Sequence, residues 1–155
     1  MKPINLLSIG IASDHAGYDL KEAVKKYLEE QGVIATDFGT NSTDSCDYPD
    51  FAYPAAKSLA DKEVDYAIVI CTTGIGVSMV ANKVKGVRCS LVNNVADAIL
   101  TKEHNNSNCL ALGAKNVSLS LAEDIVDAWL SAEFAGGRHL NRVNKISVVE
   151  VNENE

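Results

Sequence analysis

A thiol that precedes a glycine-containing turn is the group in this chain best suited to chemistry. Cys71 follows the apolar run 66–70, which is typical of a buried strand, and precedes the turn 72–76. A helix start lowers the pKa of a nearby thiol, and glycines let several backbone N–H groups converge on one oxygen. The pattern predicts a partly ionised base beside an oxyanion site. A buried structural cysteine followed by a tight turn is the alternative.

The segment 13–17 places small and polar residues at the end of another predicted strand. Backbone N–H groups at a helix start bind anions, so Asp14 and His15 are candidates for contacts with an anionic substrate. His15 could also contribute a positive charge near a phosphate. The simpler interpretation is that Ser13 or Asp14 caps the helix that follows.

Arg138 and Arg142 are four residues apart and therefore share one face of a helix. Like charges at this spacing repel each other, but a shared phosphate would turn that cost into a gain. Two solvated arginines are the alternative. His104 lies at the end of another predicted helix, where a lone histidine is more often a partner of the helix dipole than a catalyst.

Length, charge and cysteine pattern restrict the class of function. The 155 residues suffice for one sizeable core, and a net charge of −7 without a basic run argues against nucleic acid as a partner. With no apolar stretch of about 18 residues and no signal-peptide cleavage site, we expect no membrane span. The four cysteines form no CxxC pair and the three histidines share no ligand spacing. We therefore expect free thiols, no metal and a cytoplasmic location.

Apolar runs alternate with amphipathic helical patterns along most of the chain. This alternation indicates βαβ crossovers, a parallel sheet covered on both faces, and one domain over residues 1–150 with a frayed tail over 151–155. Such sheets bind ligands beyond the carboxyl ends of their strands, where Cys71 and Asp14 fall. The predicted strands are 4–11, 33–38, 66–70, 87–92 and 109–112, and the predicted helices are 18–31, 51–61, 77–84, 95–103, 119–133 and, as a helix or turn, 138–146.

Taken together, the motifs resemble those of the ribose-5-phosphate isomerase B family, whose relatives act on allose and galactose phosphates. The resemblance covers about residues 4–147. Each motif alone is weak, but the ordered set is very specific. The motifs, in the order found in the family, are Ser-Asp-His-Ala-Gly at 13–17, Asp-Tyr-Pro at 47–49, Ile-Cys-Thr-Thr-Gly-Ile-Gly at 70–76, Ala-Asn-Lys at 81–83, Glu-His-Asn-Asn at 103–106 and Gly-Gly-Arg-His at 136–139.

The resemblance implies a Rossmann-like three-layer α/β/α sandwich with a five-stranded parallel sheet. It implies a homodimer, often paired into a homotetramer, with sites shared between subunits. The implied reaction interconverts ribose 5-phosphate and ribulose 5-phosphate through an enediolate, in the pentose phosphate pathway and without metal or cofactor. The matching residues are Cys71 as the base, Thr73 at the enediolate oxygens and His104 for ring opening, with substrate contacts from Asp14, His15, Thr72, Gly74, Ile75, Gly76, Asn105, Lys115 and, for the phosphate, Arg138 and Arg142.

A few positions depart from the family's pattern. Thr72 stands where glycine is common, Lys115 where arginine is common, and Asn106 where Asp is frequent. Val77 occupies the position of the glutamate base of one branch, so the chain resembles the cysteine branch. These departures leave the identity of the sugar substrate undecided. Among sugar-phosphate isomerases, the alternative is an isomerase of allose 6-phosphate or galactose 6-phosphate. A non-catalytic sugar-phosphate sensor is the alternative outside this class.

Overall fold

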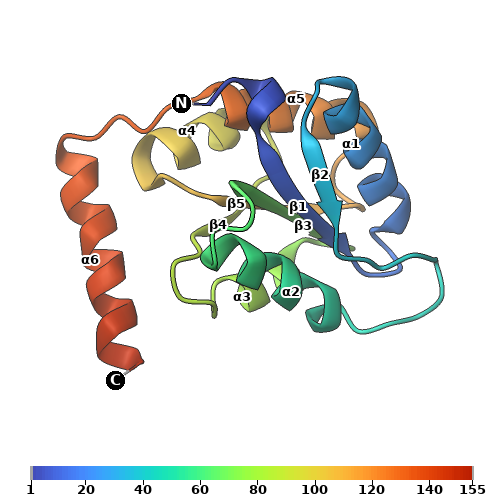
Figure 1. The fold of residues 1–155 in the computed structure, drawn as a ribbon, viewed down its shortest axis with the longest axis horizontal. Coiled ribbons are helices and arrows are strands. Elements are labelled where there is room, and N and C mark those ends of the chain that lie inside the picture. Colours follow the sequence, from blue (N-terminus) through green and yellow to red (C-terminus); the bar gives the residue numbers. More distant parts are fainter. Residues whose placement is uncertain (1, 155) are drawn as a thin grey trace.

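The computed structural model describes residues 2–154, and its five strands form one parallel sheet with the order β2-β1-β3-β5-β4 (Figure 1). The predicted α/β class with a five-stranded parallel sheet is confirmed. Within residues 2–154, no helix is both long and apolar enough to cross a membrane. The elements in chain order are a 3₁₀ turn (Ile4–Leu6), β1 (Ser8–Ser13), α1 (Tyr18–Glu30), β2 (Ile34–Asp37), α2 (Pro49–Ala60), β3 (Tyr66–Cys71), α3 (Ile75–Ala81), β4 (Cys89–Leu91), α4 (Val95–Asn105), β5 (Cys109–Gly113), α5 (Leu119–Ser131) and α6 (Arg138–Glu153).

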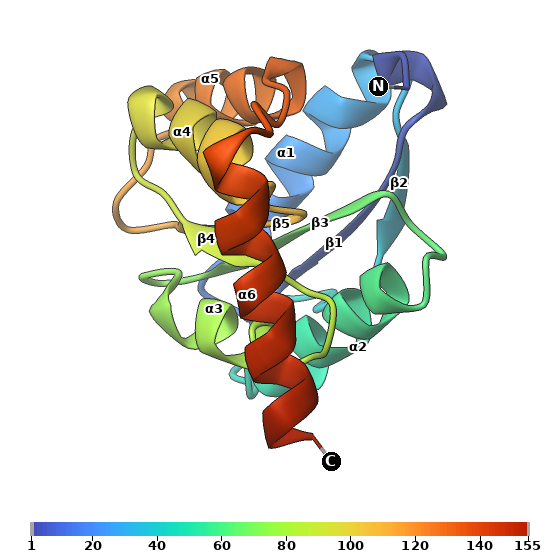
Figure 2. The same cartoon turned by 90° about the vertical axis from the view of Figure 1, so that its left-hand side faces the viewer.

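Helices cover both faces of the sheet: α1, α4 and α5 lie on one face, and α2 and α3 on the other (Figures 1 and 2). Successive residues of a strand point to opposite faces. In β3, Ile68 and Ile70 join the core on the α1 side, whereas Val69 and Cys71 join the core on the α2 side. Burial on both faces explains the unbroken apolar runs of the sequence. It also assigns the thiol to the side of α2 and α3.

The start of the chain corrects one predicted boundary. The sequence predicted a strand from residue 4, but a 3₁₀ turn occupies Ile4–Leu6 and β1 begins at Ser8. The first pair between β1 and β2 joins Ser8 to Ile34. Residues 4–6 therefore have no strand beside them, and Leu6 is 61% exposed.

The two C-terminal helices also differ from their predicted bounds. α5 ends at Ser131 rather than at residue 133. α6 continues to Glu153, well beyond the predicted end at residue 146 and into the segment expected to be frayed. No glycine or proline follows Ile146 to stop a helix, which explains the longer element.

α6 stands apart from the sandwich, beside the edge strand β4 (Figures 1 and 2). Of its described residues, Val143 alone is buried. Several apolar side chains of the helix remain exposed, and contiguous exposed apolar residues mark an interaction surface. These side chains are Leu140, Ile146, Val148, Val149 and Val151.

The order of the strands reverses at β1, which has β2 on one side and β3 on the other. Loops that leave two such strands diverge and open a crevice at their carboxyl ends. Ser13 and Ile70 are paired in register, so β1 and β3 end at the same level. The N–H of Asp14 then donates to the C=O of Ile70 at 3.2 Å. The segments around Asp14 and Cys71 therefore lie side by side.

The turn after β3 packs tightly against the end of β5. Backbone N–H groups of residues 114 and 115 donate to the C=O groups of Cys71 and Thr72, both at 2.9 Å. Gly74 has a φ of 78°, and a Cβ at this position would lie 2.4 Å from Cδ1 of Leu91. Both the backbone conformation and the available space therefore require glycine at position 74.

Lys102 fastens α4 to α5 next to the end of α4. Its buried Nζ donates to the C=O of Trp129 at 2.9 Å and lies 4.3 Å from the ring centroid of Tyr66 and 4.7 Å from that of Trp129. The carbonyl and the ring faces favour the ammonium form, whereas burial opposes it. Burial dominates and lowers the pKa of Lys102 to about 8.

The first prediction compares two glycines with positive φ. Replacing Gly74 with Ala is expected to lower the free energy of unfolding by about 2–4 kcal/mol, from left-handed strain plus overpacking. Gly86→Ala is the matched control, because Gly86 has a φ of 89° but nothing within 4 Å of an added Cβ. Gly86→Ala should lower the free energy of unfolding by the left-handed strain alone, about 1–2 kcal/mol. Urea titrations measure both values, and equal losses would contradict the packing argument.

The second prediction concerns pH. The pKa of Lys102 is about 8 in the folded chain and 10.5 ordinarily, so the unfolded chain binds more protons between these values. The free energy of unfolding contributed by this residue therefore rises with pH in that window. Between about pH 7 and about pH 9, the difference in stability between wild type and Lys102→Met should shift in favour of wild type by about 1 kcal/mol. A difference that stays constant with pH would contradict the assignment.

Candidate active site

Cys71 is the last residue of β3 and its side chain is almost enclosed, with 5% exposed. Its Sγ accepts a hydrogen bond from the N–H of Gly74 at 3.2 Å. In the same turn, Oγ1 of Thr73 accepts from the N–H of Ile75 at 3.2 Å. The hydroxyl proton of Thr73 is thus available to an acceptor outside the turn. The thiol and one backbone N–H that points at it therefore lie in the expected turn, and the oxyanion site beside them stays a prediction.

Asp14 and His15 lie in the loop after β1, beside Cys71. Asp14 is buried, and its Oδ1 accepts from the N–H of Gly17 at 3.0 Å, so it caps the turn that opens α1. Nδ1 of His15 accepts from the N–H of Cys46 at 3.2 Å. An imidazole that accepts at Nδ1 carries its proton on Nε2 when neutral, which makes Nε2 a donor for an anion. The contact with Cys46 had no signal in the sequence, because the residues are far apart and share no periodic pattern.

Tyr48 closes one side of the turn. A Cβ on Gly76 would lie 2.7 Å from Cζ of Tyr48, so the ring rests directly on the backbone of Gly76. The ring is still 39% exposed. From the sequence, the Asp-Tyr-Pro segment at 47–49 could shape a site loop or merely form a turn. The structure places its ring against the turn that follows Cys71.

The predicted site residues fall into two groups within one chain. We call the first the Cys71 group: it lies at the carboxyl edge of the sheet, in the loops after β1, β3 and β5. Its members are Asp14, His15, Cys71, Thr72, Thr73, Gly74, Ile75, Gly76 and Lys115.

The second group, which we call the His104 group, lies at the opposite edge and consists of His104, Asn105, Arg138 and Arg142. The helix α4 runs back from the carboxyl end of β4, over about 16 Å at 1.5 Å per residue. Just beyond it, the C=O of residue 108 accepts from the N–H of residue 67, near the start of β3. The chain therefore does not bring these four residues to Cys71, in contrast to the single cluster that a site within one chain would need.

The start of α6 is held against the end of α4 (Figure 1). The N–H of Ala135 donates to the C=O of Glu103 at 3.0 Å. The rings of His104 and His139 are stacked, with centroids 4.3 Å apart and an angle of 12° between planes. Arg138 thus lies next to His104 in the chain's fold. His139 was not singled out in the sequence beyond its place in a motif.

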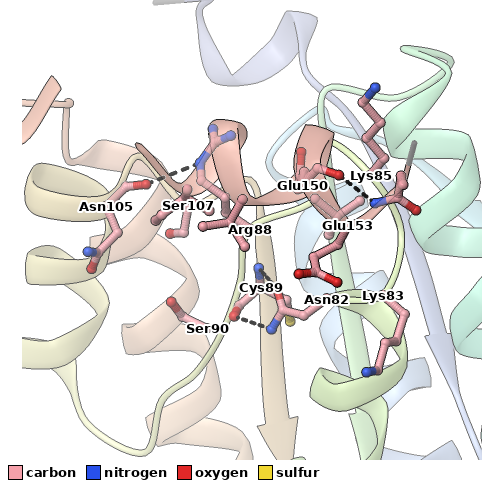
Figure 3. A pocket seen from close by; sticks show the side chains of 14 residues that line it. Asn82, Lys83, Lys85, Arg88, Cys89, Ser90, Asn105, Ser107, Glu150 and Glu153 are labelled. Carbon is pink, nitrogen blue, oxygen red and sulfur yellow. Dashed lines mark hydrogen bonds between the residues drawn. The ribbon is translucent and has the colours of Figure 1, made fainter. Parts of the chain in front are cut away.

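A cavity of about 660 Å³ lies between α6 and the β4 edge, and Figure 3 shows its lining. Lys83, Lys85 and Arg88 line it together with Glu150 and Glu153, and the N–H of Gly86 donates to Oε1 of Glu150 at 3.0 Å. No member of the Cys71 group lines this cavity. In residues 2–154, no three His, Cys, Asp or Glu side chains converge as metal ligands.

Similar proteins exist both in sequence and in structure. Ribose-5-phosphate isomerase B of Escherichia coli is 43% identical over 94% of this chain and 98% of its own. A D-erythrulose-4-phosphate isomerase of Pectobacterium atrosepticum is 39% identical over 94% of this chain and 96% of its own. The structure of ribose-5-phosphate isomerase B from Clostridium thermocellum superimposes with a TM-score of 0.94 and 48% identity, covering 96% of this chain and all of that one.

The family model described as Ribose/Galactose Isomerase matches residues 9–146, which include both groups of candidate residues. The match spans β1 through the first half of α6, and the fold agrees with the solved relative over almost its whole length. The chain therefore belongs to the ribose/galactose isomerase family of sugar-phosphate isomerases.

Proposed function

We propose that this protein interconverts D-ribose 5-phosphate and D-ribulose 5-phosphate, with Cys71 as the base. The supporting observation is the contact of 3.2 Å between the N–H of Gly74 and Sγ of Cys71, at the level where β1 and β3 both end. A thiolate in this position is held by a charge-assisted hydrogen bond. It removes the proton from C2 of the open aldose and returns it to C1, through an enediolate that is stabilised by fixed donors.

The donors for the enediolate come from the same turn. Thr73 has its hydroxyl proton free, because its oxygen already accepts from Ile75. The turn 72–76 that carries this hydroxyl is fixed by its own hydrogen bonds, so the donor need not reorganise as the negative charge develops. Cys71 is 5% exposed and the neighbouring Thr72 is exposed, so the substrate would approach the thiol across this turn.

The His104 group supports the steps that surround proton transfer. Ribose 5-phosphate is mostly a closed ring, and His104 would act as the general acid that opens it. Arg138 and Arg142 are exposed at the start of α6 and would bind the phosphate as a clamp. Asn105, next to His104, would contact the sugar hydroxyls.

We infer that a second copy of the chain completes each site, as a dimer or a pair of dimers, because the two groups lie at opposite edges of one sheet. Each group also adjoins exposed apolar residues. Ile75 and Met79 of α3 are 47% and 62% exposed near Cys71, and Leu140 of α6 is 50% exposed near Arg138. A two-fold interface that joins these surfaces would bury them and bring the partner's His104 group to Cys71.

The most specific part of the proposal is the preference for ribose 5-phosphate over other sugar phosphates. Relatives of similar identity act on sugars of different length, so identity alone does not select the sugar. Thr72 and Lys115 border the turn and would set the room and the charge around the distal end of the substrate. Allose 6-phosphate and galactose 6-phosphate are the alternatives for the same chemistry, and kcat/KM for each sugar ranks them.

The free thiol of Cys71 also indicates the kind of cellular compartment in which the protein would work. Cys71 can act as a base only when reduced, and all four cysteines are free. A reducing compartment such as the cytoplasm therefore suits the proposed reaction.

The third prediction tests the base. Cys71→Ala is expected to lower kcat for ribose 5-phosphate by at least about a hundredfold, the contribution of a positioned base. The formation of ketose measures turnover, and far-UV circular dichroism verifies folding. Cys89→Ala is the matched control, because Cys89 lies in β4 outside both groups; it should keep its activity. A folded Cys71→Ala protein with nearly wild-type turnover would refute the assignment, and wild type that binds the sugar without converting it would favour a sensor.

The fourth prediction tests the phosphate clamp. Arg138→Ala is expected to raise KM by about tenfold while kcat changes much less, because binding to a remote phosphate is largely uniform between substrate and transition state. Lys26→Ala on α1 removes an exposed charge elsewhere and should leave KM unchanged. Initial rates over a range of ribose 5-phosphate concentrations separate the two parameters. An unchanged KM in Arg138→Ala would exclude this residue from the phosphate site.

A further inference from the structure

We propose that His139 is a positioning residue for ring opening: its imidazole stacks on that of His104 and fixes the orientation of that ring. This inference rests on the proposed function, in which His104 opens the sugar ring. The observation behind it is the stack itself, with ring centroids 4.3 Å apart and planes inclined by 12°. Within residues 2–154, no other aromatic ring stacks on His104.

The stack joins the end of α4 to the start of α6, and a backbone hydrogen bond joins the same two regions. His104 is in the last turn of α4, and His139 is in the first turn of α6. The hydrogen bond of 3.0 Å from the N–H of Ala135 to the C=O of Glu103 fixes the approach of the connecting segment. On the other side of His104, Lys102 fastens α4 to α5 through the C=O of Trp129. The backbone of His104 is therefore held in place by the packing of α4, and its imidazole is held by the nearly parallel ring of His139.

The charges around the pair disfavour a proton on His139. His104 stands where a helix dipole favours a cation, whereas His139 stands at a helix start, where the dipole disfavours one. The groups that face His139 are Arg138 and Arg142 on its own helix, and His104 and Glu103 on α4. Partial burial and the positive charges of His104 and the two arginines lower the pKa of His139, against the opposite effect of Glu103.

Two imidazolium rings at this separation repel each other strongly, so the pair holds one proton more easily than two. His139 is therefore the poorer site for a proton. A general acid for ring opening needs a proton and a fixed direction of donation. His139 would supply the second, without touching the substrate itself.

The test separates ring opening from proton transfer. Ribulose 5-phosphate cannot close a five-membered ring, because its C5 oxygen carries the phosphate. Exchange of its C1 proton with D₂O, followed by NMR, therefore needs the base but no ring opening. Isomerisation of ribose 5-phosphate needs both. For His139→Ala we expect kcat from ribose 5-phosphate to fall about tenfold, a typical share of acid catalysis, while the exchange rate stays within about twofold.

Two further variants make the result specific. His139→Phe keeps a flat ring on His104 and should restore most of the kcat that His139→Ala loses. Asn144→Ala, at an exposed position of the same helix, is the matched control and should behave as wild type in both assays. Size-exclusion chromatography verifies that all variants keep the wild-type assembly.

The proposal is overturned if His139→Ala keeps its kcat, if it loses exchange in the same proportion as isomerisation, or if His139→Phe is as impaired as His139→Ala. Failure of the proposed function would look different. In that case wild type itself would show neither isomerisation nor exchange, whatever residue stands at position 139.

Discussion

The hydrogen bond from the N–H of Gly74 to the sulfur of Cys71 is the interaction on which the rest of the site depends. It exists only because the chain turns through a left-handed glycine directly after β3. The end of β5 fixes that turn through two backbone hydrogen bonds, and Leu91 leaves no space for a side chain at position 74. The thiol is thus held by the packing of three neighbouring strands, which are among the most rigid parts of such a fold.

The sheet topology explains why polar groups gather at this point and not elsewhere. The strand order reverses at β1, so the loops after β1 and β3 part and leave their backbone groups accessible. Asp14 bridges the two strands by donating its N–H to Ile70, while its carboxylate is used in capping the turn before α1. The interpretation of Asp14 as a cap and its candidacy as a site residue are therefore compatible. A group that stabilises its own loop can still present that loop to a ligand.

Much of the fold was predictable because buried parallel strands read as continuous apolar runs, and the Cys71 turn was predictable because glycine and a polar strand end have local signals. The remaining features depend on distant partners. The rings of Tyr48 and His139 are placed by contacts with Gly76 and His104, which no periodic pattern encodes. The predicted strand at residue 4 was wrong because apolar character alone does not supply a neighbouring strand. The position of His104 and Cys71 at opposite edges follows from the direction in which α4 returns across the sheet, which a helix between two parallel strands already implies.

The separation of the two groups has a genetic consequence under the proposed pairing. A chain that has lost its thiol can still lend its histidine and arginines to a neighbour, and a chain without its arginines can still offer its thiol. Two different defective alleles in one cell would then assemble mixed dimers with one intact centre out of two. Damage to α6 and damage to the turn after β3 should therefore complement each other, whereas two lesions within the same group should not.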